Sequence, residues 1–306
     1  MISNVHTDCR DEKRTLIYLC YGDLLHVREA KFSILTLINR CKDLVDKYRI
    51  VVYTDNVDEF ADYPVTVEFL SSETLESWLG GGNYIHRRKI MTIIHALEKY
   101  ASPLAFIDSD TWFKKSPAHI FKRIGPGRTC LHLSEGRIDQ VPELRAWSEV
   151  AEKEPLHIFE RETHMERNSR MWNSGVIGIH PEDGYLIREC LSMVDQMCIK
   201  YVKHCTDEQK FHTIEQMAMG YLFERYTRTN SSNDIVFHYW RNYLKAPFLK
   251  LFPDLVDARP GSDILLQAHS VYRRPPPPRG LRRLRILVTD LLHDLGLALH
   301  NLRASA

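Results

Sequence analysis

Three hydrophobic runs, each followed by polar residues, constrain the fold of this 306-residue chain more than any other feature. They are TLIYLCY at 15–21, RIVVY at 49–53 and PLAFI at 103–107. Apolar residues recur at helical spacing between them, over 26–47 and 84–100. Apolar strands that alternate with helices are typical of a parallel sheet with helices on both faces. Ligands of such sheets bind at the carboxyl ends of the strands.

The rest of the chain extends this pattern. We expect further short strands at 65–70, 171–180 and 235–239, and helices over 182–204 and 207–225. The polar stretch 114–170 predicts a mixture of helices and loops that lines one wall of a binding pocket. The sequence therefore predicts an α/β fold with one doubly wound, mostly parallel sheet and flanking helices.

Charge and cysteine content narrow the class of protein. Lys and Arg number 41 against 40 Asp and Glu, and this balance argues against a general nucleic-acid binder. Seven cysteines are scattered without a CxxC pair, which indicates reduced thiols in a cytoplasmic protein. The polar start of the chain does not resemble a secretory signal, and no run of 18 apolar residues is present to span a membrane.

The C-terminal segment differs from the body. A Pro/Arg-rich linker at 270–280 contains four consecutive prolines and precedes a basic amphipathic helix that we expect at 281–306. One apolar stripe runs along this helix, and three arginines crowd its beginning, at 282, 283 and 285. The segment 273–306 is expected to lie on an anionic membrane surface. Packing on the body or on a second subunit is the alternative, and the oligomeric state stays open.

Asp108 and Asp110 carry the strongest chemical signal. They follow the strand that ends at Ile107, and residues two apart in an extended chain point to the same side. Two adjacent carboxylates repel each other unless a cation lies between them, and oxygen ligands suit a divalent metal. Such a metal could clamp a diphosphate. The alternative is that one aspartate caps a helix and the other is solvated.

LAFIDSDTWF resembles the metal-binding DxD segment of nucleotide-sugar-dependent glycosyltransferases of the GT-A fold. RRKIMTIIHAL, WNSGVIGIH, TDEQKFH and VFHYW resemble further segments of these families, in the same order, over about 15–245. The resemblance implies a GT-A catalytic domain at 1–269, with a nucleotide-sugar half at 15–113 and an acceptor and metal half at 114–250. It also implies Mn²⁺ or Mg²⁺, and a donor such as a UDP-sugar.

The resemblance implies roles for particular residues. The metal ligands would be Asp108, Asp110 and His238, and Asp108 could instead hold the donor's ribose. Tyr21 and Asp55 would contact the nucleobase and ribose. The family's closing His, Gly and Lys-Pro-Trp pattern is absent here, so Lys245 as a diphosphate contact rests on the lysine alone.

Further roles follow from the same resemblance. Lys89 would reach the donor's phosphate or sugar. Asn173 and Ser174 would bond sugar hydroxyls, and Gly175 would let the backbone approach closely. Asp207 and Glu208 would act as a general base in an inverting enzyme or touch the donor sugar in a retaining one.

Structural alternatives exist for these residues: strand-end packing for Tyr21, a turn for Asp55 and a core imidazole for His238. Lys89 could be a solvated helix residue, and the Asn-Ser-Gly segment a β-bulge. The acidic pair at 207–208 could serve only the dipole of a helix.

The expected function is metal-dependent transfer of a sugar from a nucleotide-diphosphate-sugar to a hydroxyl of a bacterial-type glycan or a lipid-linked glycan at the membrane surface. The chain would then be cytoplasmic and peripheral to the membrane. One alternative is a catalytically inactive membrane-associated scaffold that keeps the transferase fold. A phosphatase of the DxDxT type is disfavoured because the threonine follows the second aspartate directly.

Overall fold

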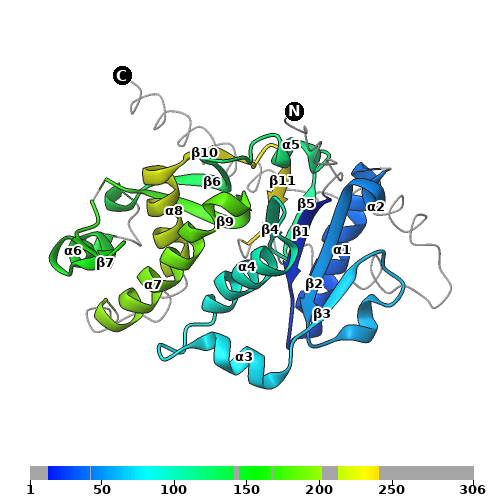
Figure 1. Ribbon diagram of the computed structural model, residues 1–306, viewed down its shortest axis with the longest axis horizontal. Helices are drawn as coiled ribbons and strands as arrows, with labels where there is room; N and C mark the ends of the chain where they lie inside the picture. Colours follow the sequence, from blue (N-terminus) through cyan, green and yellow to red (C-terminus); the bar gives the residue numbers. More distant parts are fainter. Residues whose placement is uncertain (1–12, 42, 141–144, 167, 202–212, 241–306) are drawn as a thin grey trace, which may run out of the picture.

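The protein is described by a computed structural model that places residues 13–41, 43–140, 145–166, 168–201 and 213–240 (Figure 1). Its centre is a seven-stranded sheet. In spatial order the strands are β10 (Arg228–Ser231), β6 (Arg128–Arg137), β9 (Arg170–Ile179), β4 (Leu104–Ile107), β1 (Arg14–Leu19), β2 (Tyr48–Thr54) and β3 (Thr66–Phe69). Strand β9 runs antiparallel to its neighbours β4 and β6, and every other pair is parallel. The predicted mostly parallel α/β sheet with flanking helices is confirmed.

Helices cover both faces of the sheet. One face and its buried cluster are covered by α3 (Ser72–Leu79), α4 (Arg87–Tyr100), α6 (Arg145–Lys153), α7 (Tyr185–Lys200) and α8 (Ile214–Tyr226). The other face packs against α1 (Leu24–Arg40), α2 (Leu44–Lys47), α5 (Ala118–Phe121) and a ribbon of β5 (Thr111–Phe113) and β11 (Val236–His238). The remaining elements are the hairpin of β7 (Leu156–Ile158) and β8 (Arg161–Thr163), and the 3₁₀ turns Val57–Phe60, Ile138–Gln140 and Pro181–Asp183.

The apolar run of β1 follows from burial on both sides. Ile17 packs into the cluster beneath α4, α7 and α8, whereas Leu16 and Tyr18 pack beneath α1. All three side chains are fully buried. Successive side chains of a strand point to opposite faces, so a strand buried on both faces must be apolar throughout.

Most predicted elements occur where the sequence places them. The six predicted strands correspond to β1, β2, β3, β4, β9 and β11, and the helices predicted over 84–100 and 182–204 are α4 and α7. The single helix predicted over 26–47 is wrong, because Cys41 is extended and ends α1 before α2 begins. The helix predicted over 207–225 is described from Ile214 onward, and 202–212 lie outside the described residues.

The prediction of only helices and loops over 114–170 is also wrong. The ten-residue strand β6 enters the central sheet between β10 and β9. Its first half is buried, but its second half reads Ser134-Glu135-Gly136-Arg137 and is only partly buried. The polar half obscures the strand pattern, and its Glu135 lines a cavity described below.

The topology collects strand ends at one edge of the sheet. Parallel strands β1, β2 and β4 end side by side, so Tyr21, Asp55 and Asp108 follow them at the same edge. Antiparallel β9 passes this edge in mid-strand, where the Asp108 N–H donates to the Gly175 carbonyl at 2.9 Å. Among the described helices, none is both long and apolar enough to cross a bilayer. The segments 241–269, 270–280 and 281–306 lie outside the described residues.

Candidate functional site

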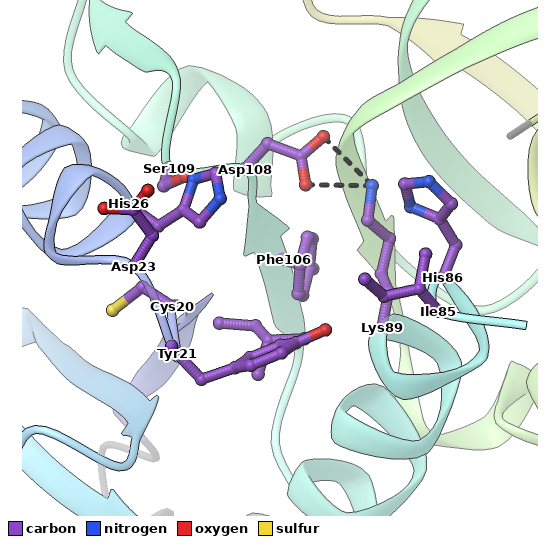
Figure 2. A pocket seen from close by; sticks show the side chains of 12 residues that line it. Cys20, Tyr21, Asp23, His26, Ile85, His86, Lys89, Phe106, Asp108 and Ser109 are labelled. Carbon is purple, nitrogen blue, oxygen red and sulfur yellow. Dashed lines mark hydrogen bonds and ion pairs between the residues drawn. The ribbon is translucent and has the colours of Figure 1, made fainter. Parts of the chain in front are cut away.

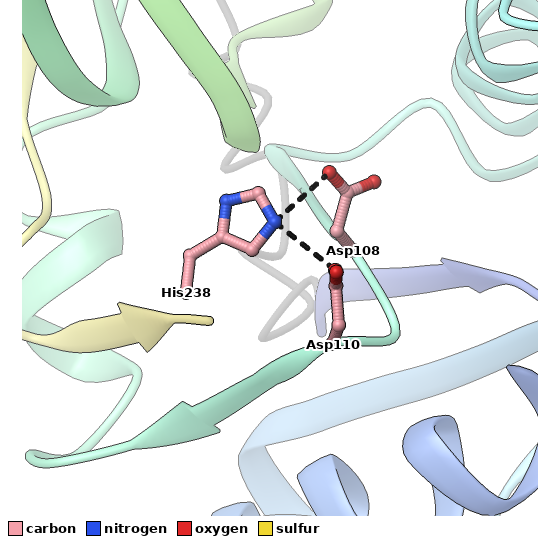
Figure 3. A group of neighbouring side chains, drawn as sticks. All are labelled: Asp108, Asp110 and His238. Carbon is pink, nitrogen blue, oxygen red and sulfur yellow. Dashed lines mark hydrogen bonds and ion pairs between the residues drawn. The ribbon is translucent and has the colours of Figure 1, made fainter. Parts of the chain in front are cut away.

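Asp108, Asp110 and His238 meet although the histidine lies 128 residues after the nearer aspartate. The ribbon of β5 and β11 brings them together, because His238 pairs with Thr111 and the Tyr239 N–H donates to the Asp110 carbonyl at 3.0 Å. One ligand atom from each of the three side chains lies within 4.8 Å of the others (Figure 3). Figure 3 shows both carboxylates facing the same edge of the imidazole ring.

Asn173 determines which ring nitrogen of His238 carries a hydrogen. The Asn173 side-chain oxygen accepts from the Gly175 N–H at 3.0 Å, so this atom is the acceptor end of the amide. The same oxygen lies 2.8 Å from His238 Nδ1, which must therefore carry the hydrogen. The other nitrogen, Nε2, faces Asp110 Oδ1 at 3.0 Å and Asp108 Oδ2 at 3.8 Å. In a neutral ring, its lone pair points at the two carboxylates.

This arrangement fits a divalent cation. Carboxylate oxygens and an imidazole nitrogen are ligands of divalent metals, which bind such atoms at about 2.0–2.2 Å. A metal-binding histidine is usually oriented by donation from its remote ring N–H to an oxygen acceptor, the part that Asn173 plays here. The side chains are shielded but not sealed, since Asp108 and Asp110 are 21% and 15% exposed and His238 is 6% exposed. Within the described residues, this is the cluster of three such ligands that the geometry singles out.

Gly175 is a packing requirement of the same cluster. A Cβ at this position would lie 2.1 Å from His238 Nδ1. Real side chains do not approach this closely, so the imidazole can occupy its place only against a glycine. The sequence Asn-Ser-Gly thus supplies both the acceptor for the ring and the space for it.

Lys89 forms the opposite wall of the site. From α4 its ammonium contacts both carboxylate oxygens of Asp108, at 2.8 and 2.9 Å (Figure 2). It also donates to Ser174 Oγ at 3.2 Å. Burial alone would lower the pKa of Lys89, but the carboxylates of Asp108 and Glu215 outweigh it and hold that pKa above its usual value. The lysine is therefore a fixed positive charge beside the aspartates.

A buried network on α8 supports this wall. Glu215 is 1% exposed and accepts hydrogen bonds from Ser174 Oγ at 3.1 Å and from the Tyr84 hydroxyl. Burial and the Glu215 charge raise the pKa of Tyr84 well above its usual value, so the phenol stays a donor. Gln216 accepts from the Ser174 N–H at 3.2 Å. Glu215 and Gln216 were missed by sequence reasoning, which placed the acidic pair at Asp207 and Glu208.

Another histidine backs the cluster from β6. His132 meets the His238 ring edge-on at 5.4 Å and donates from Nε2 to the Val236 carbonyl at 3.2 Å. Burial, aided by the neighbouring His238, lowers the pKa of His132 to about 3, so its ring is neutral near pH 7. Trp240 covers the His238 ring at 4.8 Å. His132 follows from no sequence motif, whereas Trp240 is the last residue of the VFHYW segment but had no role assigned to it.

Two adjoining cavities open on these residues. The first has a volume of about 400 Å³ and is lined by Tyr21, Gly22, His86 and Phe106 among others (Figure 2). The second has about 380 Å³ and is lined by the three-ligand cluster together with Asn173, Ser174, Glu135, Glu215, Gln216 and Trp240 among others. His26, His86, Lys89, Asp108 and Ser109 line both. Lys89 and Asp108 therefore lie at the junction of a two-chambered site.

The remaining sequence candidates are placed as follows. Tyr21 lines the first cavity, and the Arg88 guanidinium lies 4.9 Å from its ring. Asp55 is exposed and accepts from the Gly22 N–H at 3.0 Å, which fixes the loop after β1. It supports the cavity and is not among the residues that line it. Asp207, Glu208 and Lys245 lie outside the described residues.

Comparison with solved structures decides the fold. A galactosyltransferase, LgtC, in complex with donor and acceptor sugar analogues, matches over 81% of this chain and 98% of its own, with a TM-score of 0.50 and 11% identity. The chain has the GT-A fold. Mouse xyloside xylosyltransferase 1, in its apo form, matches over 72% of this chain and 84% of its own, with a TM-score of 0.45 and 14% identity. No family model and no curated protein sequence matches the chain.

Proposed function

We propose that this GT-A chain is a metal-dependent glycosyltransferase that moves a sugar from a nucleoside-diphosphate sugar, such as a UDP-sugar, to a hydroxyl group of a glycan or lipid-linked glycan. One observation carries the proposal: a three-ligand cluster and a fixed cation, Lys89, meet at the junction of two cavities. The diphosphate of such a donor is negatively charged and would be stabilised by a metal on one side and Lys89 on the other. The nucleoside and the sugar, attached to its two ends, would each need a cavity.

The two cavities would hold different parts of the nucleotide-sugar donor. The nucleobase and ribose fit the first cavity, where Tyr21 offers a ring face and the loop after β1 is held by Asp55. The diphosphate would lie at the junction, between Lys89 and the metal ligands. The sugar would enter the second cavity, where Asn173 and Ser174 present polar atoms beside the closely approaching Gly175 backbone.

A metal held by Asp108, Asp110 and His238 would neutralise the charge that develops on the departing nucleoside diphosphate. Mg²⁺ prefers oxygen ligands alone, so the imidazole in this set favours Mn²⁺. Lys89 adds a second positive charge on the other side of Asp108, and the buried Glu215 and Tyr84 hold Ser174 in place.

The residues around the transferred sugar are assigned from their place in the second cavity. Glu215 and Gln216 lie at its wall, so we place them against the donor sugar or the attacking hydroxyl. Asp207 and Glu208, which lie outside the described residues, are proposed as the acidic pair that acts either as general base or as sugar contact. Lys245 is proposed as a further diphosphate contact.

A panel of nucleotide sugars tests the function. Wild-type protein with Mn²⁺ is expected to hydrolyse or transfer one donor of the panel, and EDTA is expected to abolish the activity. Asp110→Asn removes a metal ligand and should lower the rate more than about 100-fold. Asp58→Asn removes an exposed carboxylate that lines neither cavity, serves as the matched control and should leave the rate unchanged.

Activity that survives both EDTA and Asp110→Asn would disprove the metal-dependent mechanism. If the protein binds no nucleotide sugar of the panel, the result would favour the alternative of a catalytically inactive scaffold. Hydrolysis of simple phosphate esters, without nucleotide-sugar turnover, would favour the phosphatase.

We further propose that the segment 273–306 holds the enzyme at an anionic membrane surface, as its seven arginines against two aspartates suggest. Full-length protein should sediment with vesicles of phosphatidylcholine and phosphatidylserine, and not with phosphatidylcholine alone. Replacement of Arg282, Arg283 and Arg285 by Gln should weaken this binding about 100-fold, at ~1 kcal/mol per charge. If wild type and the variant sediment equally with the phosphatidylserine vesicles, the result would favour packing of the segment on the body or on a second subunit.

A further inference from the structure

A third, smaller cavity lies at the far end of α8 from the metal cluster. Its volume is about 300 Å³, and its lining includes Glu166, Ser169, Arg170, Tyr221, Glu224 and Arg225. Glu215 is at the first turn of α8 and Arg225 is at its last, so the two sites are separated by about 15 Å along the helix axis. This cavity is therefore distinct from the two-chambered site.

The charges of this cavity cancel in pairs. Arg225 contacts Glu166 at 3.0 Å, and Arg170 contacts Glu224 at 3.8 Å. All four side chains remain between 31% and 59% exposed. Two guanidinium groups and two carboxylates give a dense set of donors and acceptors with no net charge. An anionic ligand such as a phosphate gains nothing from such a set, whereas neighbouring hydroxyl groups can pair with both kinds of partner.

An aromatic cluster lies at the same end of α8, on another side of the helix from the cavity. Tyr226 follows the cavity residue Arg225, and its ring meets Phe159 at 5.0 Å. Phe159 also meets Tyr185 at 5.9 Å. Tyr185 is 49% exposed and Tyr226 is 42% exposed. Exposed rings gathered in this way are unusual on a soluble surface and mark binding sites.

The backbone holds this cluster in place. Phe159 and Glu160 form the turn between β7 and β8, and both have positive φ, 49° and 63°. Glycine or asparagine is the usual residue at such positions, so an aromatic residue there is maintained at a cost. The Phe159 N–H donates to Glu189 of α7 at 2.9 Å, which ties the turn to the helix that carries Tyr185.

From their place at the same end of α8 we propose that the cavity and the aromatic cluster are two parts of one accessory binding site for an uncharged oligosaccharide, which would pass around the end of the helix. Hydroxyl groups of one sugar would pair with the Arg and Glu side chains, and the apolar C–H face of another sugar along the chain would lie on Tyr185 or Tyr226. The site would hold a glycan on the enzyme at a distance from the reaction. This inference rests on the proposed transferase function for its biological sense, but the binding itself does not require catalysis.

An array of neutral and acidic glycans, probed with the full-length protein, tests the site. We expect binding to a subset of neutral glycans, measured then by calorimetry with the strongest of them. Tyr226→Ala and the milder Glu224→Gln should each weaken that binding by about tenfold. Phe69→Ala removes a 64% exposed ring on β3, at the opposite edge of the sheet, and should leave it unchanged.

The proposal would be overturned if no neutral glycan on the array bound the protein, or if both Tyr226→Ala and Glu224→Gln bound the glycan as tightly as wild type. A lower sedimentation coefficient of Tyr226→Ala would also overturn it, because the rings would then belong to a dimer contact. Asp110→Asn separates the two proposals: it should abolish sugar transfer and leave glycan binding intact. Glycan binding by a chain without transferase activity would refute the proposed function alone.

Discussion

The position of the His238 imidazole depends on one atom that Gly175 lacks, the Cβ. Asn173 accepts from its Nδ1, so its Nε2 faces Asp108 and Asp110. Gly175 makes this position possible, because a Cβ there would lie 2.1 Å from the ring. Lys89 counters the acidic pair from the other side. The site therefore depends on small residues as much as on charged ones.

Gly175→Ala tests this dependence. The added methyl group must displace His238 or shift β9, and overpacking of this kind costs about 1–3 kcal/mol of unfolding free energy. We also expect weaker Mn²⁺ binding, measured by calorimetry, since the Nε2 atom would leave the cluster. Gly81→Ala is the control, because nothing lies within 4 Å of its Cβ position, and it should change the stability by less than about 0.5 kcal/mol. Unchanged metal affinity in Gly175→Ala would contradict the packing argument.

The ribbon of β5 and β11 is the element that delivers His238, and it is anchored by charge at its open end. Asp234, two residues before β11, receives both guanidinium nitrogens of Arg123 at 2.6 and 3.0 Å and the ammonium of Lys115 at 2.9 Å. The Arg123 hydrogen bond and the Lys115 contact hold the pKa of Asp234 well below its usual 3.8.

Asp234→Asn is expected to reveal this anchor through pH. A carboxyl whose pKa is lower in the folded protein stabilises it fully above its unfolded pKa of 3.8, and this stabilisation is lost as the pH falls toward the folded value. Asp234 is 43% exposed, so the contribution near pH 6 is about 1 kcal/mol after screening by solvent. Urea unfolding should therefore separate the variant from wild type most at pH 6, and the gap should begin to shrink as the pH falls below 3.8. Glu162→Gln on exposed β8 provides the control, and a gap that widens toward pH 3 would refute the anchor.

Elements with one dominant pattern were predictable from the sequence, including β4, whereas β6 and the side chains that join the site only through tertiary contacts were not. Strand β4 is apolar throughout and is followed directly by Asp108, so both the strand and the carboxylates could be recognised. Strand β6 changes from buried apolar residues to Glu135 at the cavity, which hid it. Glu215 is buried in an apolar helix, and only its contacts with Ser174 and Tyr84 reveal its place. Side chains that act through tertiary contacts leave no spacing in the sequence.

At the scale of the whole molecule, the two-chambered site draws on both sides of the central sheet. Tyr21 follows β1, Lys89 comes from α4, Asn173 from β9, Glu215 from α8 and His238 from β11. These elements belong to both buried clusters of the protein. A ligand that bridges the cavities contacts groups that separate only when the entire domain unfolds, so its binding should stabilise the protein as a unit.

A thermal unfolding series measures this coupling. A ligand at 100 times its Kd stabilises the folded state by about 2.7 kcal/mol, a rise of several degrees in Tm for a domain of this size. We expect UDP or GDP with Mn²⁺ to give this rise, and either component alone to give less, because the diphosphate would join Lys89 to the metal ligands. EDTA should remove the gain, and Asp110→Asn should reduce it. An equal rise in Tm with inorganic phosphate would contradict this prediction. It would mean that the site recognises only the anion and that the first cavity, around Tyr21, takes no part in binding.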